Sequence, residues 1–196
     1  MRKTVVMALA LVAGLASGAL GQGANTLKWT LGPEKRIWLE GTSTVRRFSC
    51  STESFEAVPT PPPSLGTPLD KAVRSVDVTV PVKSLACGNG TMDEHMRKAL
   101  KADANPEIRF ELRTYEVGEK TAEGTAVKAE GTLTIAGTTR PVELDGVVTP
   151  TATGLRVQGQ TQILMTEYGV KPPKLMLGTL KVGDAVTVHY DVVLEK

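Results

Sequence analysis

The chain has 196 residues, with 23 basic and 21 acidic side chains and a formal net charge of +2. A charge this small, without a basic cluster, argues against binding to nucleic acid or to an anionic lipid surface. Its length is enough for one domain with a sizeable core.

Residues 1–21 have the composition of a secretory signal peptide. Arg2 and Lys3 precede an apolar run over residues 5–20, which ends in small residues that suit cleavage near residue 21. The run is too short and too rich in Gly and Ala for a convincing transmembrane helix. We therefore expect a periplasmic or secreted protein, with no stable membrane span after cleavage and one domain over residues 22–196.

Alternation of apolar and polar residues dominates the rest of the chain and predicts strands with one buried face. In chain order, the expected strands cover residues 26–31, 37–42, 45–51, 76–82, 108–113, 127–135, 142–148, 155–165 and 186–194. Ala136-Gly137-Thr138-Thr139 predicts a tight hairpin, and Val182-Gly183-Asp184 predicts a turn into the last strand. The pattern indicates an all-β, antiparallel fold of about eight strands, either a sandwich or a barrel.

Two segments interrupt the alternation. Residues 56–70 are rich in proline and are expected to form an exposed loop. Residues 91–102 are expected to form a short helix that begins with a capping box, Thr91 to Glu94. Its apolar stripe, Met92, Met96 and Leu100, predicts packing against the sheet.

Cys50 and Cys87 are the only cysteines. In an exported chain two cysteines most often form a disulfide, and closing this loop would stabilise the fold by about 4 kcal/mol. A redox-active thiol is the alternative, but the Cys-x-x-Cys spacing of such sites is missing.

Catalytic and metal-binding patterns are not found in the sequence. His95 and His189 lack the spacing of a metal pair and are expected to be ordinary surface residues. Asp93 and Glu94 are adjacent on the predicted helix, where they suit a helix start better than acid–base chemistry. We expect no enzymatic activity, no cofactor and no metal site.

The interior of the expected barrel permits two interpretations. A closed barrel of about eight strands holds either its own side chains or one small apolar ligand. The inward-facing residues are mainly Val, Ala, Gly and Thr, and the chain has only eight aromatic residues. Composition therefore leaves a ligand cavity and a packed core equally open.

Several segments, in the correct order, resemble the YceI-like family of exported bacterial proteins. They include residues 41–45, 80–85 and 105–110, and the segment 131–142, which is close to the family's most recognisable hairpin. The resemblance implies a lipocalin-like barrel with a helix beside it. It also implies a periplasmic role in which the interior holds a polyisoprenoid, a quinone or an acyl chain.

Some details set this chain apart within the family. Arg46 and Arg47 stand where similar proteins often have His and Asp, and the proline-rich loop resembles an insertion. Cys50 and Cys87 resemble a paired-cysteine branch of the family, which supports the disulfide.

The resulting hypothesis is a periplasmic carrier or sequestering protein for an isoprenoid or acyl lipid. The residues expected to line the cavity are Val45, Phe48, Val78, Val80, Phe110, Leu112, Leu133, Ile135, Leu144, Ile163, Met165, Val188 and Tyr190, with Tyr168 and Met176 at a mouth. The alternative is a packed, ligand-free barrel that acts as an interaction or stress-protection module in the envelope.

Overall fold

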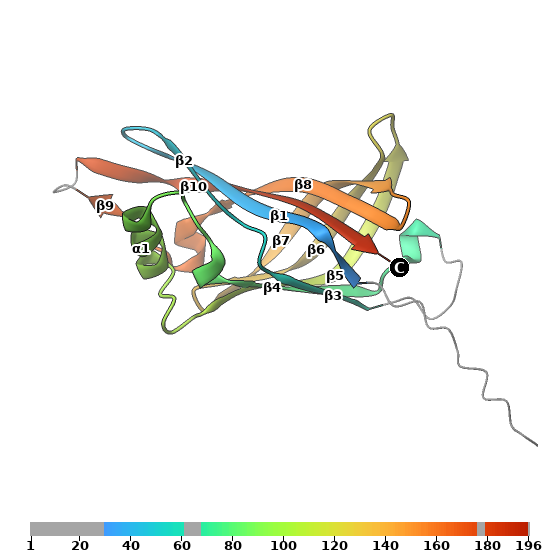
Figure 1. Ribbon diagram of the computed structural model, residues 1–196, viewed down its shortest axis with the longest axis horizontal. Coiled ribbons are helices and arrows are strands. Elements are labelled where there is room, and N and C mark those ends of the chain that lie inside the picture. The colour runs from blue at the N-terminus through green and yellow to red at the C-terminus, as the bar shows by residue number, and fades with distance from the viewer. Residues whose placement is uncertain (1–29, 61–67, 176–178, 196) are drawn as a thin grey trace, which may run out of the picture.

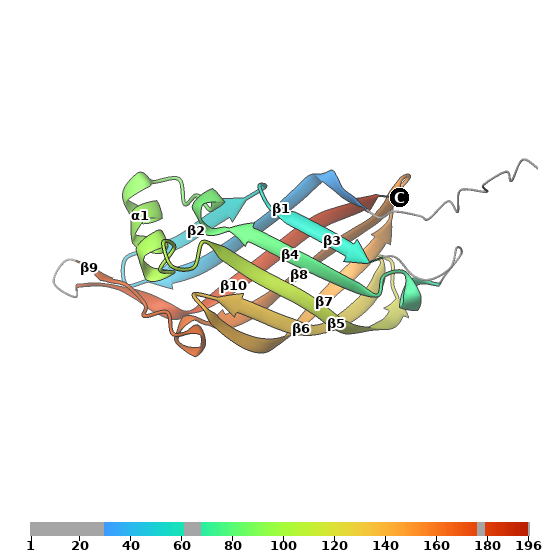
Figure 2. The same cartoon turned by 90° about the horizontal axis from the view of Figure 1, so that it is seen from below.

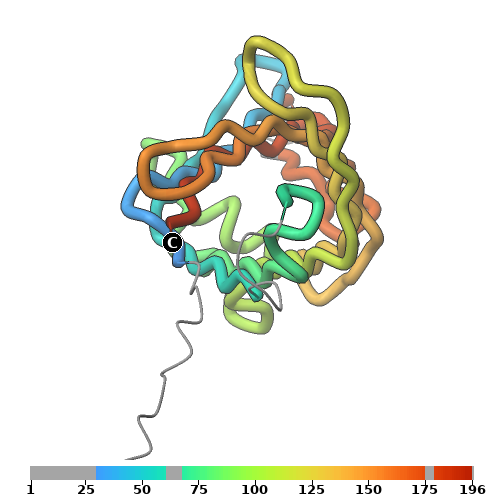
Figure 3. The backbone as a smooth tube through the Cα atoms, turned by 90° about the vertical axis from the view of Figure 1, so that its right-hand side faces the viewer, coloured from blue at the N-terminus to red at the C-terminus, as the bar shows by residue number. Residues whose placement is uncertain are grey.

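Nine strands pair edge to edge in one antiparallel sheet that curls around its own apolar face. A computed structural model describes residues 30–60, 68–175 and 179–195. Within these residues the strand order is β2-β1-β10-β8-β7-β6-β5-β4-β3, and a short further strand, β9, pairs with β10. Viewed along the long axis, the strands surround a central space (Figure 3). The predicted antiparallel barrel with one short helix is confirmed.

The elements follow one another in an up-and-down order, apart from the early strands. The strands are β1 Thr30–Ser43, β2 Arg47–Thr52, β3 Glu56–Thr60, β4 Ser75–Pro81, β5 Glu107–Lys120, β6 Thr125–Ile135, β7 Thr138–Pro150, β8 Gly154–Leu164, β9 Lys174–Leu175 and β10 Leu180–Glu195. The α-helix is α1, Gly90–Ala99, and three short 3-10 helices are η1 Leu69–Lys71, η2 Val82–Ser84 and η3 Met165–Tyr168.

The alternation in the sequence explains the inner and outer faces of the sheet. On β4, Val78 faces the interior and pairs with Phe110 of β5, which in turn pairs with Leu133 of β6. The intervening residues Asp77 and Arg109 are exposed. Because side chains alternate along a strand, this register places the three apolar residues on the same face.

The first strands differ in extent from the prediction. In place of the two strands expected at residues 26–31 and 37–42, the described residues form one strand, β1, with an irregularity in its pairing between Leu31 and Lys35. The preceding residues 26–29 lie outside the described part of the chain. Strand β2 begins at Arg47, two residues later than expected.

One of the two predicted turns is confirmed and the other is wrong. The β6–β7 hairpin turns on Ala136 and Gly137, whose φ angles of 50° and 82° suit a two-residue hairpin loop. Val182-Gly183-Asp184, by contrast, lies within β10, which continues to Leu180 and pairs there with β9. Asp184 instead accepts hydrogen bonds from the amide and hydroxyl of Thr166.

The helix is shorter than the predicted 91–102 and is capped by a different residue. Asn89 is the N-cap, and its side chain accepts a hydrogen bond from the Met92 amide at 3.1 Å. The predicted capping box at Thr91 is therefore wrong. The helix ends at Ala99, and Lys101 then has a positive φ of 54°. Figure 2 shows α1 at one end of the barrel, where Leu100 packs against buried side chains.

The proline-rich segment 56–70 is not a continuous loop. Its first residues form β3, which pairs with β4 at the edge of the sheet. Pro59 is tolerated there because proline is compatible with edge strands. Residues 61–67 lie outside the described part, and Leu69–Lys71 form η1 at the opposite end of the barrel from α1 (Figure 1).

The disulfide between Cys50 and Cys87 is confirmed. It joins β2 to the segment before α1, next to a two-hydrogen-bond bridge between Ser51 and Ala86. These links lie at β2, one of the two edge strands of the sheet. The other edge strand is β3, and the two do not pair with each other in the described residues. Lys35 of β1 adds a hydrogen bond to the carbonyl of Phe55, just before β3.

Candidate functional site

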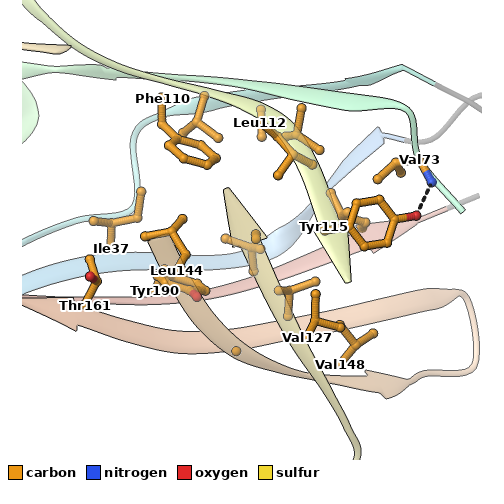
Figure 4. A pocket seen from close by; sticks show the side chains of 18 of the residues that line it. Ile37, Val73, Phe110, Leu112, Tyr115, Val127, Leu144, Val148, Thr161 and Tyr190 are labelled. Carbon is orange, nitrogen blue, oxygen red and sulfur yellow. Dashed lines mark hydrogen bonds between the residues drawn. The ribbon is translucent and has the colours of Figure 1, made fainter. Parts of the chain in front are cut away.

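An apolar cavity of about 270 Å³ lies inside the barrel. Side chains from eight strands line it, together with Leu69, Ala72 and Val73 from η1 and the residues that follow it. Figure 4 shows Phe110 and Leu112 on one side of this space, and Leu144 and Tyr190 on the other. No charged residue is among the lining residues.

Three lining side chains carry a hydroxyl group, and each hydroxyl donates its hydrogen to a backbone carbonyl. Tyr115 donates to Leu69 at 2.9 Å, Thr161 to Glu143 at 3.1 Å and Tyr190 to Asp145 at 3.0 Å. Because a hydroxyl has only one hydrogen, these lining side chains offer the cavity no free donor.

Burial governs the chemistry of the two lining tyrosines. Desolvation raises the pKa of Tyr190 to about 12, and the nearby Asp145 carboxylate adds to the shift. Burial also raises the pKa of Tyr115, although hydrogen bonds with the backbone near Val73 oppose the shift. Both phenols are therefore neutral at physiological pH, in keeping with an apolar interior.

The two ends of the cavity are built differently. Towards α1, Ile135, Tyr168 and Val170 form a buried cluster, and Ile108 and Leu133 of the cavity wall pack against it. At the other end, η1 covers the interior. The Tyr115 hydroxyl holds η1 in this position. The hydroxyl donates a hydrogen bond to the Leu69 carbonyl and accepts a longer one from the Val73 amide.

The family model for YceI-like domains matches residues 42–194. The chain belongs to the YceI-like family. The match begins near the end of β1 and includes every cavity-lining residue except Ile37.

Solved structures show the same fold. The structure of BcnA from Burkholderia cenocepacia is 18% identical with a TM-score of 0.65, covering 81% of this chain and 95% of that one. A polyisoprenoid binding domain from Saccharophagus degradans is 14% identical with a TM-score of 0.65, covering 86% and 98%. The YCEI protein of Campylobacter jejuni is 22% identical with a TM-score of 0.59, covering 75% and 84%. A comparison with curated proteins gave no match.

Eight of the predicted residues lie together in the cavity wall of this YceI-like barrel. They are Val78, Val80, Phe110, Leu112, Leu133, Leu144, Val188 and Tyr190.

The other predicted residues lie elsewhere. Ile135, Ile163, Met165 and Tyr168 belong to the packed cluster near α1 or contact it. Tyr168 is 3% exposed and so does not stand at a mouth.

Val45 and Phe48 are also outside the wall. Val45 is 69% exposed in the turn between β1 and β2, so its assignment to the cavity is wrong. Phe48 lies against Gly41 rather than in the cavity wall. Met176 lies outside the described residues.

Sequence reasoning missed several lining residues, for two different reasons. Val76, Ala129, Val157 and Val192 share the inward phase of residues already assigned, so alternation alone could have found them. Tyr115 could not be found in this way, because the pairing of β5 shifts between Leu112 and Thr114 and reverses the inward phase.

His189 is more buried than the ordinary surface residue that was expected. Its ring stacks on Trp38 with the centroids 4.8 Å apart, and its side chain is only 19% exposed. The paired strands β1 and β10 place these two residues directly opposite each other. In the described residues, no three potential metal ligands of the His, Cys, Asp or Glu type come together. No helix among them is long and apolar enough to cross a membrane.

Proposed function

We propose that this protein binds the apolar chain of a lipid, such as a polyisoprenoid, a quinone or an acyl chain, inside its barrel. The observation that carries the proposal is the cavity of about 270 Å³ with hydrocarbon walls. Each methylene group that moves from water into such a space contributes about 0.8 kcal/mol. A chain of ten such groups is therefore bound firmly without any polar contact.

The likeness to a polyisoprenoid binding domain supports this choice of ligand class. So does the size of the cavity, because well-packed protein interiors have few voids larger than a water molecule. A packed barrel that serves only as an envelope interaction module would have no use for a space of this size. We infer a binding role without catalysis, in which the protein carries or sequesters its lipid.

The proposed place of action is the periplasm or the extracellular space. The Cys50–Cys87 disulfide supports it, since structural disulfides persist in oxidising compartments. The signal peptide expected over residues 1–21 lies outside the described residues and remains a prediction.

Lipid extraction from the natively purified protein tests the proposal. Organic extraction followed by mass spectrometry should give about one lipid per protein molecule. Leu144→Trp adds bulk to the cavity wall and should remove the lipid, because the indole would occupy the space of the chain.

Leu164→Trp is the matched control. Leu164 ends the neighbouring strand β8, is 38% exposed and does not line the cavity, so this variant should keep its lipid. An extract of the unmodified protein without lipid would contradict the proposal. So would equal lipid content in the Leu144 and Leu164 variants, provided circular dichroism shows both to be folded.

A further inference from the structure

We propose that the β1–β2 turn and the adjoining β9–β10 pair form a docking surface for an anionic phospholipid bilayer. This tip surface consists of Val45, Arg46 and Arg47, from the turn and the start of β2, together with Lys174 of β9 and Lys181 of β10. None of these five described residues lines the cavity, so docking does not depend on the proposed ligand.

Hydrogen bonds join the two parts of the tip surface. Thr44 donates its amide hydrogen to the Lys181 carbonyl at 2.9 Å and its hydroxyl hydrogen to the Thr179 carbonyl at 3.0 Å. The Lys181 amide in turn donates to the Thr44 hydroxyl at 3.2 Å. Figure 1 shows both parts at the end of the barrel where α1 lies. Because Thr44 and Thr179 are 135 residues apart, no local pattern in the sequence indicates this contact.

The tip surface carries four positive charges and no negative one. Residues 41–52 and 173–183 together contain Arg46, Arg47, Lys174 and Lys181 but no Asp or Glu. All four basic side chains are exposed, and none takes part in an ion pair among the described residues. The small net charge of the chain therefore conceals a basic cluster that forms only when the chain folds.

Two of the lysines face each other without an acidic partner among the described residues. Lys174 of β9 and Lys181 of β10 occupy directly opposite positions in the sheet. Like charges at such positions repel each other and destabilise the strand pair. A phosphate group bound between them would replace this repulsion by attraction, so the arrangement favours an anionic partner.

The opposite end of the barrel carries the opposite charge. Residues 116–123, at the end of β5 and in the turn that follows, contain three glutamates and one lysine. The hydrogen bond from the Tyr115 hydroxyl to Leu69 places the end of β5 beside η1. Helix α1, at the same end as the tip surface, has two acidic and two basic residues and adds no net charge. An anionic bilayer would therefore attract the tip surface and repel the η1 end, so that the barrel docks end-on.

Val45 favours a bilayer over other polyanions. Its side chain is 69% exposed, the largest value for a large apolar residue in the described part of the chain. Arg46 and Arg47 follow it directly. An apolar side chain beside basic ones suits a lipid surface, where phosphates lie above a hydrocarbon layer. A nucleic acid offers phosphates without such a layer.

Co-sedimentation with vesicles tests the docking surface. The natively purified protein would be mixed with vesicles of phosphatidylglycerol and phosphatidylcholine in equal parts, or of phosphatidylcholine alone. Each basic residue near an anionic bilayer strengthens binding about fivefold, so the anionic vesicles should bind at least about a hundredfold more tightly. Salt should weaken this binding, because it screens exposed charges. Equal binding to both kinds of vesicle would overturn the proposal.

Two double variants with the same net charge locate the surface. Lys174→Gln with Lys181→Gln should weaken binding to the anionic vesicles about twenty-fivefold. Its fold should survive, since the change removes a repulsion between β9 and β10. Lys71→Gln with Lys120→Gln is the matched control, because both residues are exposed and lie towards the η1 end. An equal loss in the two double variants would overturn the location of the surface.

A serine at position 45 separates a bilayer from a nucleic acid. Val45→Ser should weaken vesicle binding about tenfold, which is the contribution of burying most of a valine side chain. Val58→Ser is the matched control, because Val58 is 59% exposed on the edge strand β3, away from the tip surface, and should bind as before. Tighter binding to a single-stranded oligonucleotide than to vesicles, unchanged in Val45→Ser, would assign the basic residues to nucleic acid and overturn the proposal.

The cavity variant Leu144→Trp distinguishes docking from lipid uptake. It should bind the anionic vesicles as tightly as the unmodified protein does, because Leu144 lies in the cavity wall and not in the tip surface. Loss of vesicle binding in this variant, with the fold intact, would overturn the docking surface and leave the proposed function standing. The lysine variant should in turn retain its extractable lipid, so an extract without lipid from the unmodified protein bears on the proposed function alone.

Discussion

Three aromatic residues of the barrel lie against glycines. These large rings thus occupy space that a side chain at the glycine position would otherwise fill. Phe48 lies on Gly41, Phe110 on Gly131, and Tyr190 on Gly146 and Gly159. A glycine within a strand weakens it, but an aromatic ring packed across it restores the lost contacts. These glycines are therefore a packing feature, since none of the four has a positive φ angle.

Gly159→Ala should destabilise the protein because its added methyl group would collide with the Tyr190 ring and with the backbone carbonyl of Asp145. Overpacking of this kind costs about 1–3 kcal/mol. Urea denaturation should show that loss in the free energy of unfolding. Gly90→Ala is the control, because nothing lies within 4 Å of the added atom at the start of α1. An equal loss in both variants would contradict the packing argument.

Tyr190 should make stability fall at high pH. Its pKa of about 12 in the folded state lies above the ordinary value of 10, so the unfolded chain ionises first. The contribution of the neutral phenol to stability is complete below pH 10 and is lost as the pH rises towards 12. Absorbance at 295 nm should record a tyrosine that titrates near pH 12 in the native protein. Tyr190→Phe should abolish that phase, and its survival would assign the shift to another tyrosine.

Among the elements, β2 depends most on a covalent link. It pairs with β1 on one side, while its other side has a single bridge to Ala86 and the disulfide to Cys87. Replacing both cysteines with alanine should lower the free energy of unfolding by about 4 kcal/mol, as expected for a loop of 37 residues. Denaturation with and without dithiothreitol measures this loss. The reductant should destabilise only the unmodified protein, and an effect of equal size on the double variant would refute the assignment.

Most elements were predictable because their residues alternate without interruption. Strands β4 and β6 to β8 follow the apolar phase of the sequence, and the Ala136-Gly137 turn is short enough to be recognised locally. The errors occur where a local signal competes with a tertiary one. Asn89 caps α1 in place of the Thr91–Glu94 motif, and Asp93 in the first turn accepts a hydrogen bond from the amide of Cys87. The disulfide that fixes Cys87 is not a local feature.

At the scale of the whole molecule, the sequence could identify an apolar interior but not whether that interior is filled. Both a packed core and a cavity require inward-facing Val and Leu, so composition cannot distinguish them. The difference depends on the shift in β5 that turns Tyr115 inward and on the placement of η1, whose Leu69 lines the cavity. Neither has a signature in the strand pattern. Eight of the thirteen predicted lining residues were therefore found, while the cover of the cavity was missed.

The edge strands β2 and β3, which end the strand order without pairing with each other in the described residues, have a further consequence for the protein in concentrated solution. Unpaired strand edges recruit strands from other molecules, and natural sheets discourage this with prolines and charged residues at the edge. Both devices are present here, as Pro59 in β3 and Arg47 in β2. The disulfide adds a third, since it keeps β2 fastened to its own chain. We expect reduction to promote self-association and aggregation through β2, so that an oxidising environment maintains the protein as a dispersed species.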